Sequence, residues 1–204
     1  MVIAPPLRAS VAEALALRGV SLDALERCAG AIALFGSRAG RCERPSSDWD
    51  LLAIGDGAYR KRDGLDLVWV RAEDVAGDTW LGGDLAGHVL SHGIWLRGEP
   101  SWRLGDLRFD LAVRRKQQHL IRSMRSLGEV WDILGPGYQR KHATLLRRDV
   151  QRLHLLARGV PVPPSAHLDA SWTDHPAAAA LLQDTLRQMG AHAPLAAEIV
   201  ARVG

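Results

Sequence analysis

The stretch that most constrains this chain covers residues 34–52, where an apolar segment ends in a glycine-serine turn that precedes two closely spaced aspartates. The run Ala31–Phe35 is predicted to be a buried strand that ends at Gly36. Asp48 and Asp50 occupy positions i and i+2, and side chains alternate between the faces of an extended strand, so both carboxylates are expected on one side. Two like charges held so close are unfavourable unless one carboxyl is protonated or a cation neutralises both.

A third carboxylate, Asp66, lies in the apolar, β-rich run Leu65–Val70, which is predicted to be a strand able to lie beside the first two aspartates. Oxygen ligands of this kind suit Mg²⁺, which proteins hold with a few carboxylates and with the phosphates of a substrate. Glycine at position 36 permits a close approach of the backbone to phosphate, and Ser37 adds a hydroxyl donor. The sequence therefore predicts a metal-phosphate site made of three aspartates and the glycine-serine turn.

The order of Gly36-Ser37, the segment Ser47–Leu51 and Asp66 resembles the motif of the nucleotidyltransferase superfamily typified by DNA polymerase β. Within that superfamily the chain is most similar to the minimal nucleotidyltransferases and the aminoglycoside nucleotidyltransferases. The resemblance covers roughly residues 31–100 and depends on several elements in the right order rather than on one short motif. It implies metal binding and catalysis by Asp48, Asp50 and Asp66, and nucleotide binding by Gly36, Ser37, Arg38 and Arg41.

The turn departs from the family pattern at one point. Many minimal nucleotidyltransferases have the order Gly-Ser-x-Ala-Arg-Gly, whereas this chain has Ala39-Gly40-Arg41, with the last two residue types exchanged. Which of the two arginines, Arg38 or Arg41, reaches the phosphates therefore stays open.

The resemblance implies Mg²⁺ or Mn²⁺ as the cofactor and a nucleoside triphosphate, expected to be ATP, as the donor. The implied reaction transfers a nucleoside monophosphate to an acceptor hydroxyl and releases pyrophosphate. The acceptor is expected to be a protein, as for antitoxin-type adenylyltransferases, or a small molecule. Two alternatives stay open, namely a toxin that adds nucleotides to tRNA or another RNA, and a nonenzymatic nucleotide-binding module. The sequence leaves the oligomeric state open.

The pattern of apolar residues divides the chain into two expected domains of an α/β (α+β) protein. Residues 1–106 are expected to form a small mixed sheet flanked by helices, the nucleotidyltransferase core, and residues 107–204 a helical C-terminal domain. The expected strands cover residues 31–35, 49–54, 65–70 and 94–97. The expected helices cover residues 10–28 with an interruption near Gly19, then 84–91, 107–127, 138–158 and 173–189, with a short one after Pro194.

Positive charge is concentrated in residues 108–158, which hold 12 Lys and Arg against 4 Asp and Glu, whereas the whole chain has a net charge of only +3. This basic segment is either an ordinary solvated helix surface or a positive wall that binds triphosphate or an anionic acceptor such as RNA. The residues expected to matter for such binding are Arg114, Arg115, Lys116, Arg140 and Lys141.

Other features exclude several classes of protein. No apolar run approaches the roughly 20 residues that span a bilayer, and no signal peptide is evident, so a cytoplasmic protein without membrane association is expected. Two cysteines without zinc-ligand spacing argue against a disulfide scaffold or a structural zinc site. His88 and His92 stand four residues apart on an expected helix, and they are interpreted as surface or helix-end residues.

Overall fold

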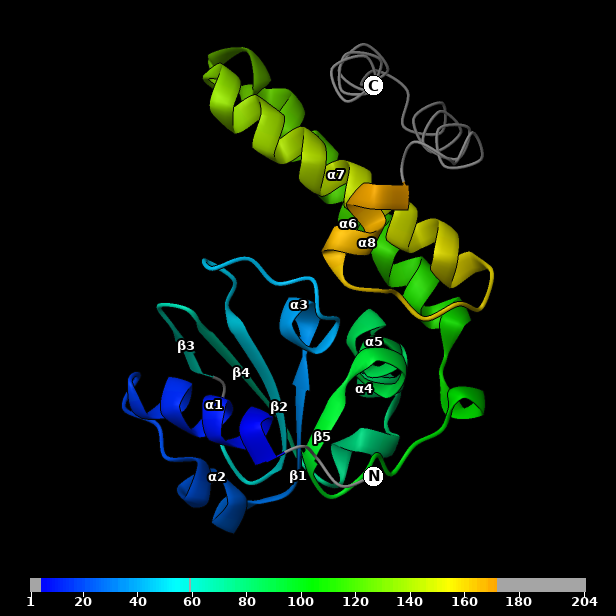
Figure 1. Ribbon diagram of the computed structural model, residues 1–204. Helices are drawn as coiled ribbons and strands as arrows, with labels where there is room; N and C mark the ends of the chain where they lie inside the picture. Colours follow the sequence, from blue (N-terminus) through cyan, green and yellow to red (C-terminus); the bar gives the residue numbers. More distant parts are fainter. Residues whose placement is uncertain (1–4, 59, 172–204) are drawn as a thin grey trace. The chain divides into compact units, whose positions relative to one another are not determined.

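A five-stranded mixed sheet with the strand order β3-β4-β2-β1-β5 forms the centre of the first part of the chain (Figure 1). The computed structural model describes residues 5–58 and 60–171 and confirms the expected mixed α/β class, with helices around the sheet and further helices after it. β2 and β4 pair in parallel, and the other neighbours pair antiparallel. The strands are β1 Ala29–Phe35, β2 Trp49–Gly55, β3 Arg60–Arg62, β4 Leu65–Val70 and β5 Ile94–Arg97.

The four strands expected from apolar runs are all present, with bounds that differ by at most two residues. β3 was not expected, because its three residues Arg60–Arg62 are all basic and all exposed. Only the adjacent Asp63-Gly64 turn indicates a hairpin that leads into β4.

Two compact units make up the chain. One contains the residues up to Arg108 together with Pro163–Ala166, and the other contains Phe109–Val162 and continues from His167. The sequence had placed this division between residues 106 and 107. The helices expected over residues 173–189 and after Pro194 lie outside the described residues.

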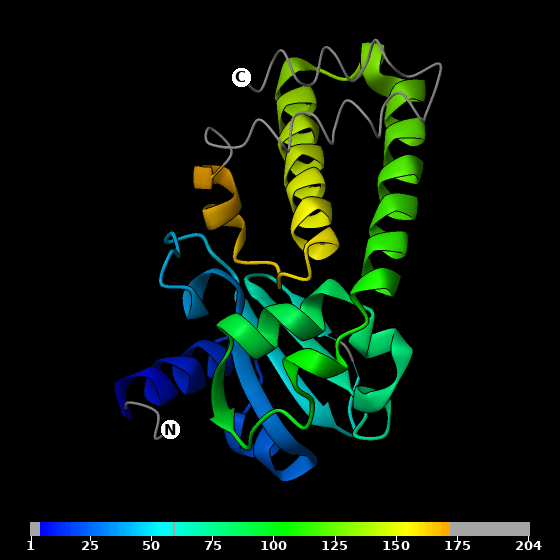
Figure 2. The same ribbon diagram turned by 90° about the vertical axis from the view of Figure 1, so that its right-hand side faces the viewer.

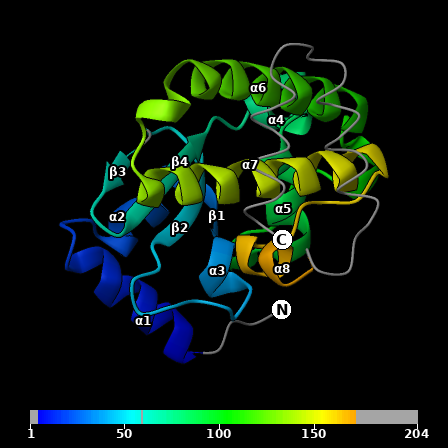
Figure 3. The same cartoon turned by 90° about the horizontal axis from the view of Figure 1, so that it is seen from above.

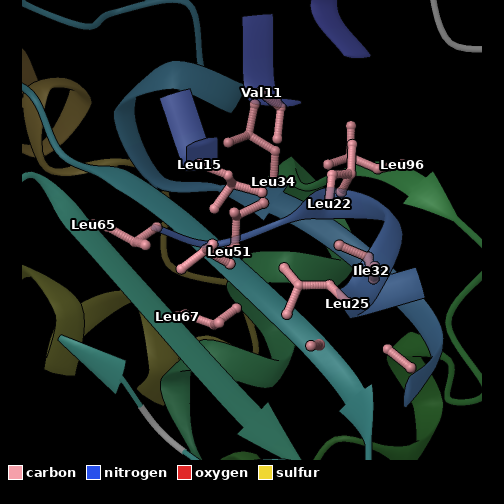
Figure 4. Packing of buried hydrophobic residues seen from close by; sticks show 13 residues of the cluster. Val11, Leu15, Leu22, Leu25, Ile32, Leu34, Leu51, Leu65, Leu67 and Leu96 are labelled. Atoms are coloured by element: carbon pink, nitrogen blue, oxygen red, sulfur yellow. The ribbon is translucent and has the colours of Figure 1, made fainter. Parts of the chain in front are cut away.

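The helices α1 Pro5–Ala16 and α2 Leu22–Cys28 cover one face of the sheet. The expected interruption near Gly19 is where α1 ends, and Gly19 has a φ of 68°. Figure 4 shows the resulting core, in which apolar side chains of both helices meet those of β1, β2 and β4. Its labelled members are Val11, Leu15, Leu22, Leu25, Ile32, Leu34, Leu51, Leu65, Leu67 and Leu96.

The opposite face of the sheet is approached by α5 Asp84–His92, which packs beside β1 and agrees with the helix expected over residues 84–91 (Figures 1 and 3). Trp102 holds this helix in place, because its Nε1 donates a 3.2 Å hydrogen bond to the carbonyl of Ala86. The indole ring of Trp102 also packs edge to face against Trp80. Trp102 is 3% exposed. The shorter elements here are α3 Gly36–Ala39, the 3-10 turn Asp74–Ala76, α4 Asp78–Leu81 and the 3-10 turn Leu104–Asp106.

The second unit is built on two long helices that run side by side, α6 Phe109–Val130 and α7 Pro136–Ala157 (Figure 2). They confirm the helices expected over residues 107–127 and 138–158. A 3-10 turn, Trp131–Ile133, leads from α6 toward α7, and α8 Ser165–Ser171 follows later. The buried residues between α6 and α7 include Leu120, Met124, Ala143, Leu146, Val150 and Leu153.

Candidate active site

Asp50 and Asp66, the facing pair, lie side by side on two neighbouring parallel strands. Asp50 of β2 pairs with Asp66 of β4, and the same row continues to Phe35 of β1 on one side and to Lys61 of β3 on the other. Residues paired laterally in a sheet point to the same face, so one row carries two carboxylates and one ammonium group. The Nζ of Lys61 lies 3.7 Å from Oδ2 of Asp66.

Asp50 sits in a strongly perturbing environment. The pKa of its carboxyl is raised from the ordinary 3.8 to about 6. Burial is the largest cause, the negative charges of Asp66 and Asp48 act in the same direction, and Lys61 and Arg38 oppose the change. Such a rise reflects first the removal of the carboxyl from water and then the neighbouring negative charges. A carboxyl of this kind, close to a second carboxylate, is a common feature of functional sites.

Asp48 does not belong to the strand row. It lies one residue before β2 and is exposed, although its charge still acts on Asp50. The structure therefore brings Asp50 and Asp66 together as a facing pair and leaves Asp48 at the edge. Within residues 5–58 and 60–171, no three His, Cys, Asp or Glu side chains are grouped closely enough to make a metal centre by themselves.

The facing pair nevertheless suits a divalent cation. Oδ1 of Asp66 is buried and has no hydrogen-bond partner among the described residues, which is costly for a carboxylate oxygen unless a cation or donor approaches it. Mg²⁺ is commonly held by one or two carboxylates together with substrate phosphates rather than by a complete protein cage. Two acids that face each other, with a third at the edge, have the chemistry of such a partly formed site.

The backbone angle and the surroundings of position 36 explain why the turn after β1 needs a glycine. Its φ is 71°, a region that side chains rarely adopt, and a Cβ at this position would lie 2.1 Å from Oδ2 of Asp50. The sequence predicted a glycine for the approach of a phosphate, whereas the contact in the structure is with the carboxylate of Asp50. Ser37 follows directly in α3 and is half-buried, so it stands within one residue of this contact.

The two arginines of the turn have different surroundings. The guanidinium of Arg38 donates to the carbonyl of Ser47 at 2.8 Å and to that of Asp48 at 3.2 Å, and it stacks on the ring of Trp49 at 4.2 Å. Arg38 therefore fastens the backbone that leads into β2. Arg41 is exposed and has a φ of 53°, in the left-handed region.

His88 was interpreted as a surface or helix-end residue, and the structure contradicts this. It is only 9% exposed, and its Nε2 accepts a 3.2 Å hydrogen bond from the backbone N–H of Gly36. The local signal for burial was its position on α5 between Ala86 and Val89, both of which are fully buried. Lys61 was also missed as a member of the site, because β3 has no apolar residue to mark it as a strand.

Part of the basic segment is neutralised within its own helices. Asp149 of α7 accepts hydrogen bonds from Lys116 at 3.3 Å and from Arg152 at 2.9 Å. Arg114 pairs with Asp110 at 2.7 Å, one turn away on α6. These pairs reduce the positive charge available to an external anion.

Neither comparison with known proteins adds to this geometry. No protein-family model matches the chain, and no curated protein matches it significantly. No helix in the described part of the chain is long and apolar enough to cross a bilayer.

Proposed function

We propose that this chain is a divalent-cation-dependent nucleotidyltransferase that transfers a nucleoside monophosphate from a nucleoside triphosphate, with ATP as the expected donor, to an acceptor hydroxyl. The observation that carries the proposal is the facing pair Asp50 and Asp66, placed directly beside the Gly36 turn. The raised pKa of Asp50 supports it, because a half-buried carboxyl beside a second carboxylate is an environment common in functional sites.

The chain's own residues have distinct tasks in this proposal. Asp50 and Asp66 hold the cation, and Asp48 adds negative charge at the edge. Ser37 presents its hydroxyl to the triphosphate, and Gly36 lets the backbone of the turn approach closely. Mg²⁺ or Mn²⁺, when bound, would neutralise the phosphate oxygens and stabilise the leaving group. Arg38 keeps the segment ahead of β2 in place, and Arg41 is the more accessible arginine for a phosphate contact.

The reaction forms one bond and breaks one bond. The acceptor oxygen attacks the α-phosphorus, the bond from that phosphorus to the α–β bridging oxygen breaks, and pyrophosphate leaves with the bridging oxygen. The hydroxyl proton passes to a carboxylate of the site, and the sequence leaves open whether Asp66 takes this proton or serves only as a cation ligand. Positioning and charge stabilisation account for most of the catalysis, because little covalent chemistry is left to the protein.

A protein or a small molecule is the proposed acceptor, and RNA is the alternative. An RNA acceptor would draw on the basic segment, yet three of its 12 cations, Lys116, Arg152 and Arg114, already have acidic partners within the second unit. This pairing favours an acceptor that does not need a continuous positive surface.

The test is transfer of label from α-³²P-nucleoside triphosphates in the presence of Mg²⁺, with and without cell lysate. Asp50→Asn removes a charge from the facing pair, and Asp63→Asn makes the same chemical change at an exposed acid as the matched control. We expect label with the wild type and with Asp63→Asn, and its loss with Asp50→Asn. The labelled fraction, whether protein, RNA or small molecule, identifies the acceptor class. Full transfer by Asp50→Asn contradicts the proposal, and tight nucleotide binding without any label favours a nonenzymatic module.

A further inference from the structure

His88 contacts the turn at Gly36 from α5, a helix that other contacts hold in place. α5 packs beside β1, and the buried Trp102 anchors it through the hydrogen bond to the carbonyl of Ala86. The His88 imidazole meets the ring of Phe35 edge to face, with centroids 6.1 Å apart and an interplanar angle of 83°. A side chain that is 9% exposed and packed in this way has little rotamer freedom, so it offers its ring nitrogen at a fixed point.

That ring nitrogen accepts a hydrogen bond from the peptide between Phe35 and Gly36. Because the N–H of Gly36 donates to Nε2 at 3.2 Å, Nε2 is the unprotonated nitrogen and the ring proton belongs on Nδ1. His88 thus serves as an acceptor rather than as a charged donor. This contact links α5 to the first residue of the turn beside Asp50.

The turn needs such a restraint. Glycine has more backbone freedom than any other residue, and Gly36 must keep a φ of 71° with its Cα hydrogens close to the carboxylate of Asp50. A rotation of the preceding peptide would change both the backbone of Gly36 and the direction in which Ser37 leaves it. No side chain at position 36 can resist that rotation, so the restraint has to come from a neighbour.

We propose that His88 is a positioning residue for the nucleotide site, which it serves by fixing the Phe35-Gly36 peptide and thereby Ser37 relative to Asp50 and Asp66. The inference rests on the proposed nucleotidyl transfer and assigns His88 no contact with the reacting atoms. Its effect is geometric, because a displacement of about 1 Å at a reacting centre can lower a rate by about a hundredfold.

Three variants separate the hydrogen bond from the packing of the ring. His88→Leu fills similar space without an acceptor, and His88→Gln can place its amide oxygen near the position of Nε2. His88→Asn stays polar, but its shorter side chain puts the oxygen out of reach of Gly36. Three quantities are measured for each folded variant: the affinity for Mg²⁺ with a nonhydrolysable ATP analogue, the transfer rate, and the hydrogen exchange of the Gly36 amide.

We expect His88→Leu and His88→Asn to lose about tenfold in transfer rate and to exchange the Gly36 amide faster, since one hydrogen bond of this kind typically contributes up to about a factor of ten. His88→Gln should recover most of the rate and of the amide protection. A merely structural role predicts no such rescue. If the wild type is active and His88→Leu and His88→Asn transfer at the same rate, the inference is overturned but the proposed function is not. The same holds if His88→Gln is as impaired as His88→Leu and His88→Asn. A wild type that neither binds nor transfers nucleotide overturns the proposed function and this inference with it.

Discussion

Asp50 and Asp66 are register partners on the parallel strands β2 and β4, so that two carboxylates of different strands share one face of the sheet. Their only basic neighbour in the same row of the sheet is Lys61 of β3, 3.7 Å from Asp66. The row therefore has more negative than positive charge before any ligand binds. That imbalance determines how the site should respond to pH and to cations.

The stability of the wild type should fall as pH rises through the titration of Asp50. Its pKa is about 6 in the folded chain against an ordinary 3.8, so the folded state binds the proton more tightly than the unfolded state. This contribution is complete below about pH 4 and is lost by about pH 7. Its size is on the order of 1–2 kcal/mol after allowance for solvent screening. Chemical denaturation between pH 4 and pH 8 without divalent cations measures it.

Asp50→Asn supplies the control for that measurement, because an amide cannot ionise. The difference in unfolding free energy between this variant and the wild type should grow in favour of the variant from pH 4 to pH 8. A constant difference over this range would mean that Asp50 has an ordinary pKa, which removes the electrostatic support for the site.

Divalent cations should stabilise the wild type against heat. At a free Mg²⁺ concentration of about ten times the dissociation constant, binding to the folded state alone contributes about 1.4 kcal/mol, which corresponds to a rise of a few degrees in Tm. The rise should be smaller at pH 5 than at pH 8, because a proton on Asp50 competes with the cation. Differential scanning calorimetry with MgCl₂, and with NaCl at matched ionic strength, provides the comparison. An equal rise in Asp50→Asn would place the bound cation elsewhere.

The sequence predicted the strands of the site and a place for Asp66 beside the first two aspartates, but not its register with Asp50. Apolar runs locate β2 and β4, and the i, i+2 spacing predicts that Asp48 and Asp50 lie on one side of a strand that contains both. However, β2 begins at Trp49, so Asp48 is exposed at its edge. The closer relation of Asp50 and Asp66 depends on register between strands that are separated in sequence by β3, and side-chain periodicity does not determine register.

The two missed members of the site, Lys61 and His88, depend on tertiary contacts more than on local patterns. Lys61 belongs to a short edge strand without apolar residues, and such a strand forms because β4 supplies its hydrogen-bond partners. His88 is buried because α5 packs beside β1, which is a tertiary event. Polar residues are usually exposed, so sequence reasoning places a lone histidine at the surface unless the packing is known.

Gly36→Ala should destabilise the protein and abolish transfer. The added Cβ would lie 2.1 Å from Oδ2 of Asp50, and alanine resists a φ of 71°, so we expect a loss of about 1–3 kcal/mol or more. Gly105→Ala is the matched control, because a Cβ there meets nothing within 4 Å, and its effect should stay within about 0.5 kcal/mol. Urea denaturation of both variants gives the comparison.

The cause of that loss can be divided further with the double variant Gly36→Ala/Asp50→Ala. The double variant removes the clash but keeps the strained φ. It should therefore be more stable than the value obtained by adding the two single losses of unfolding free energy to the wild type. Strict additivity would show that Asp50 moves away freely and that the turn is not packed against it.

In the second unit, Asp169→Asn should destabilise the chain by about 0.5–1 kcal/mol at pH 7. Asp169 accepts two hydrogen bonds from Arg148, at 2.8 and 2.6 Å, and these lower the pKa of its carboxyl, with a further contribution from Arg147. Because the folded pKa is lowered, this stabilisation is present above about pH 4 and disappears as pH falls through the folded value. The variant and the wild type should therefore converge once the pH lies below the folded pKa of Asp169.

Asp110→Asn is the matched control for this ion pair. Asp110 also pairs with an arginine, Arg114 at 2.7 Å, but both side chains are largely exposed, at 73% and 65%. Pairs of that kind contribute little, because water screens the charges and the side chains lose freedom. Urea denaturation at pH 7 should thus separate the two variants, with Asp169→Asn clearly less stable than Asp110→Asn. Equal stability would mean that the paired hydrogen bonds of Asp169 are no stronger than an exposed contact within one helix.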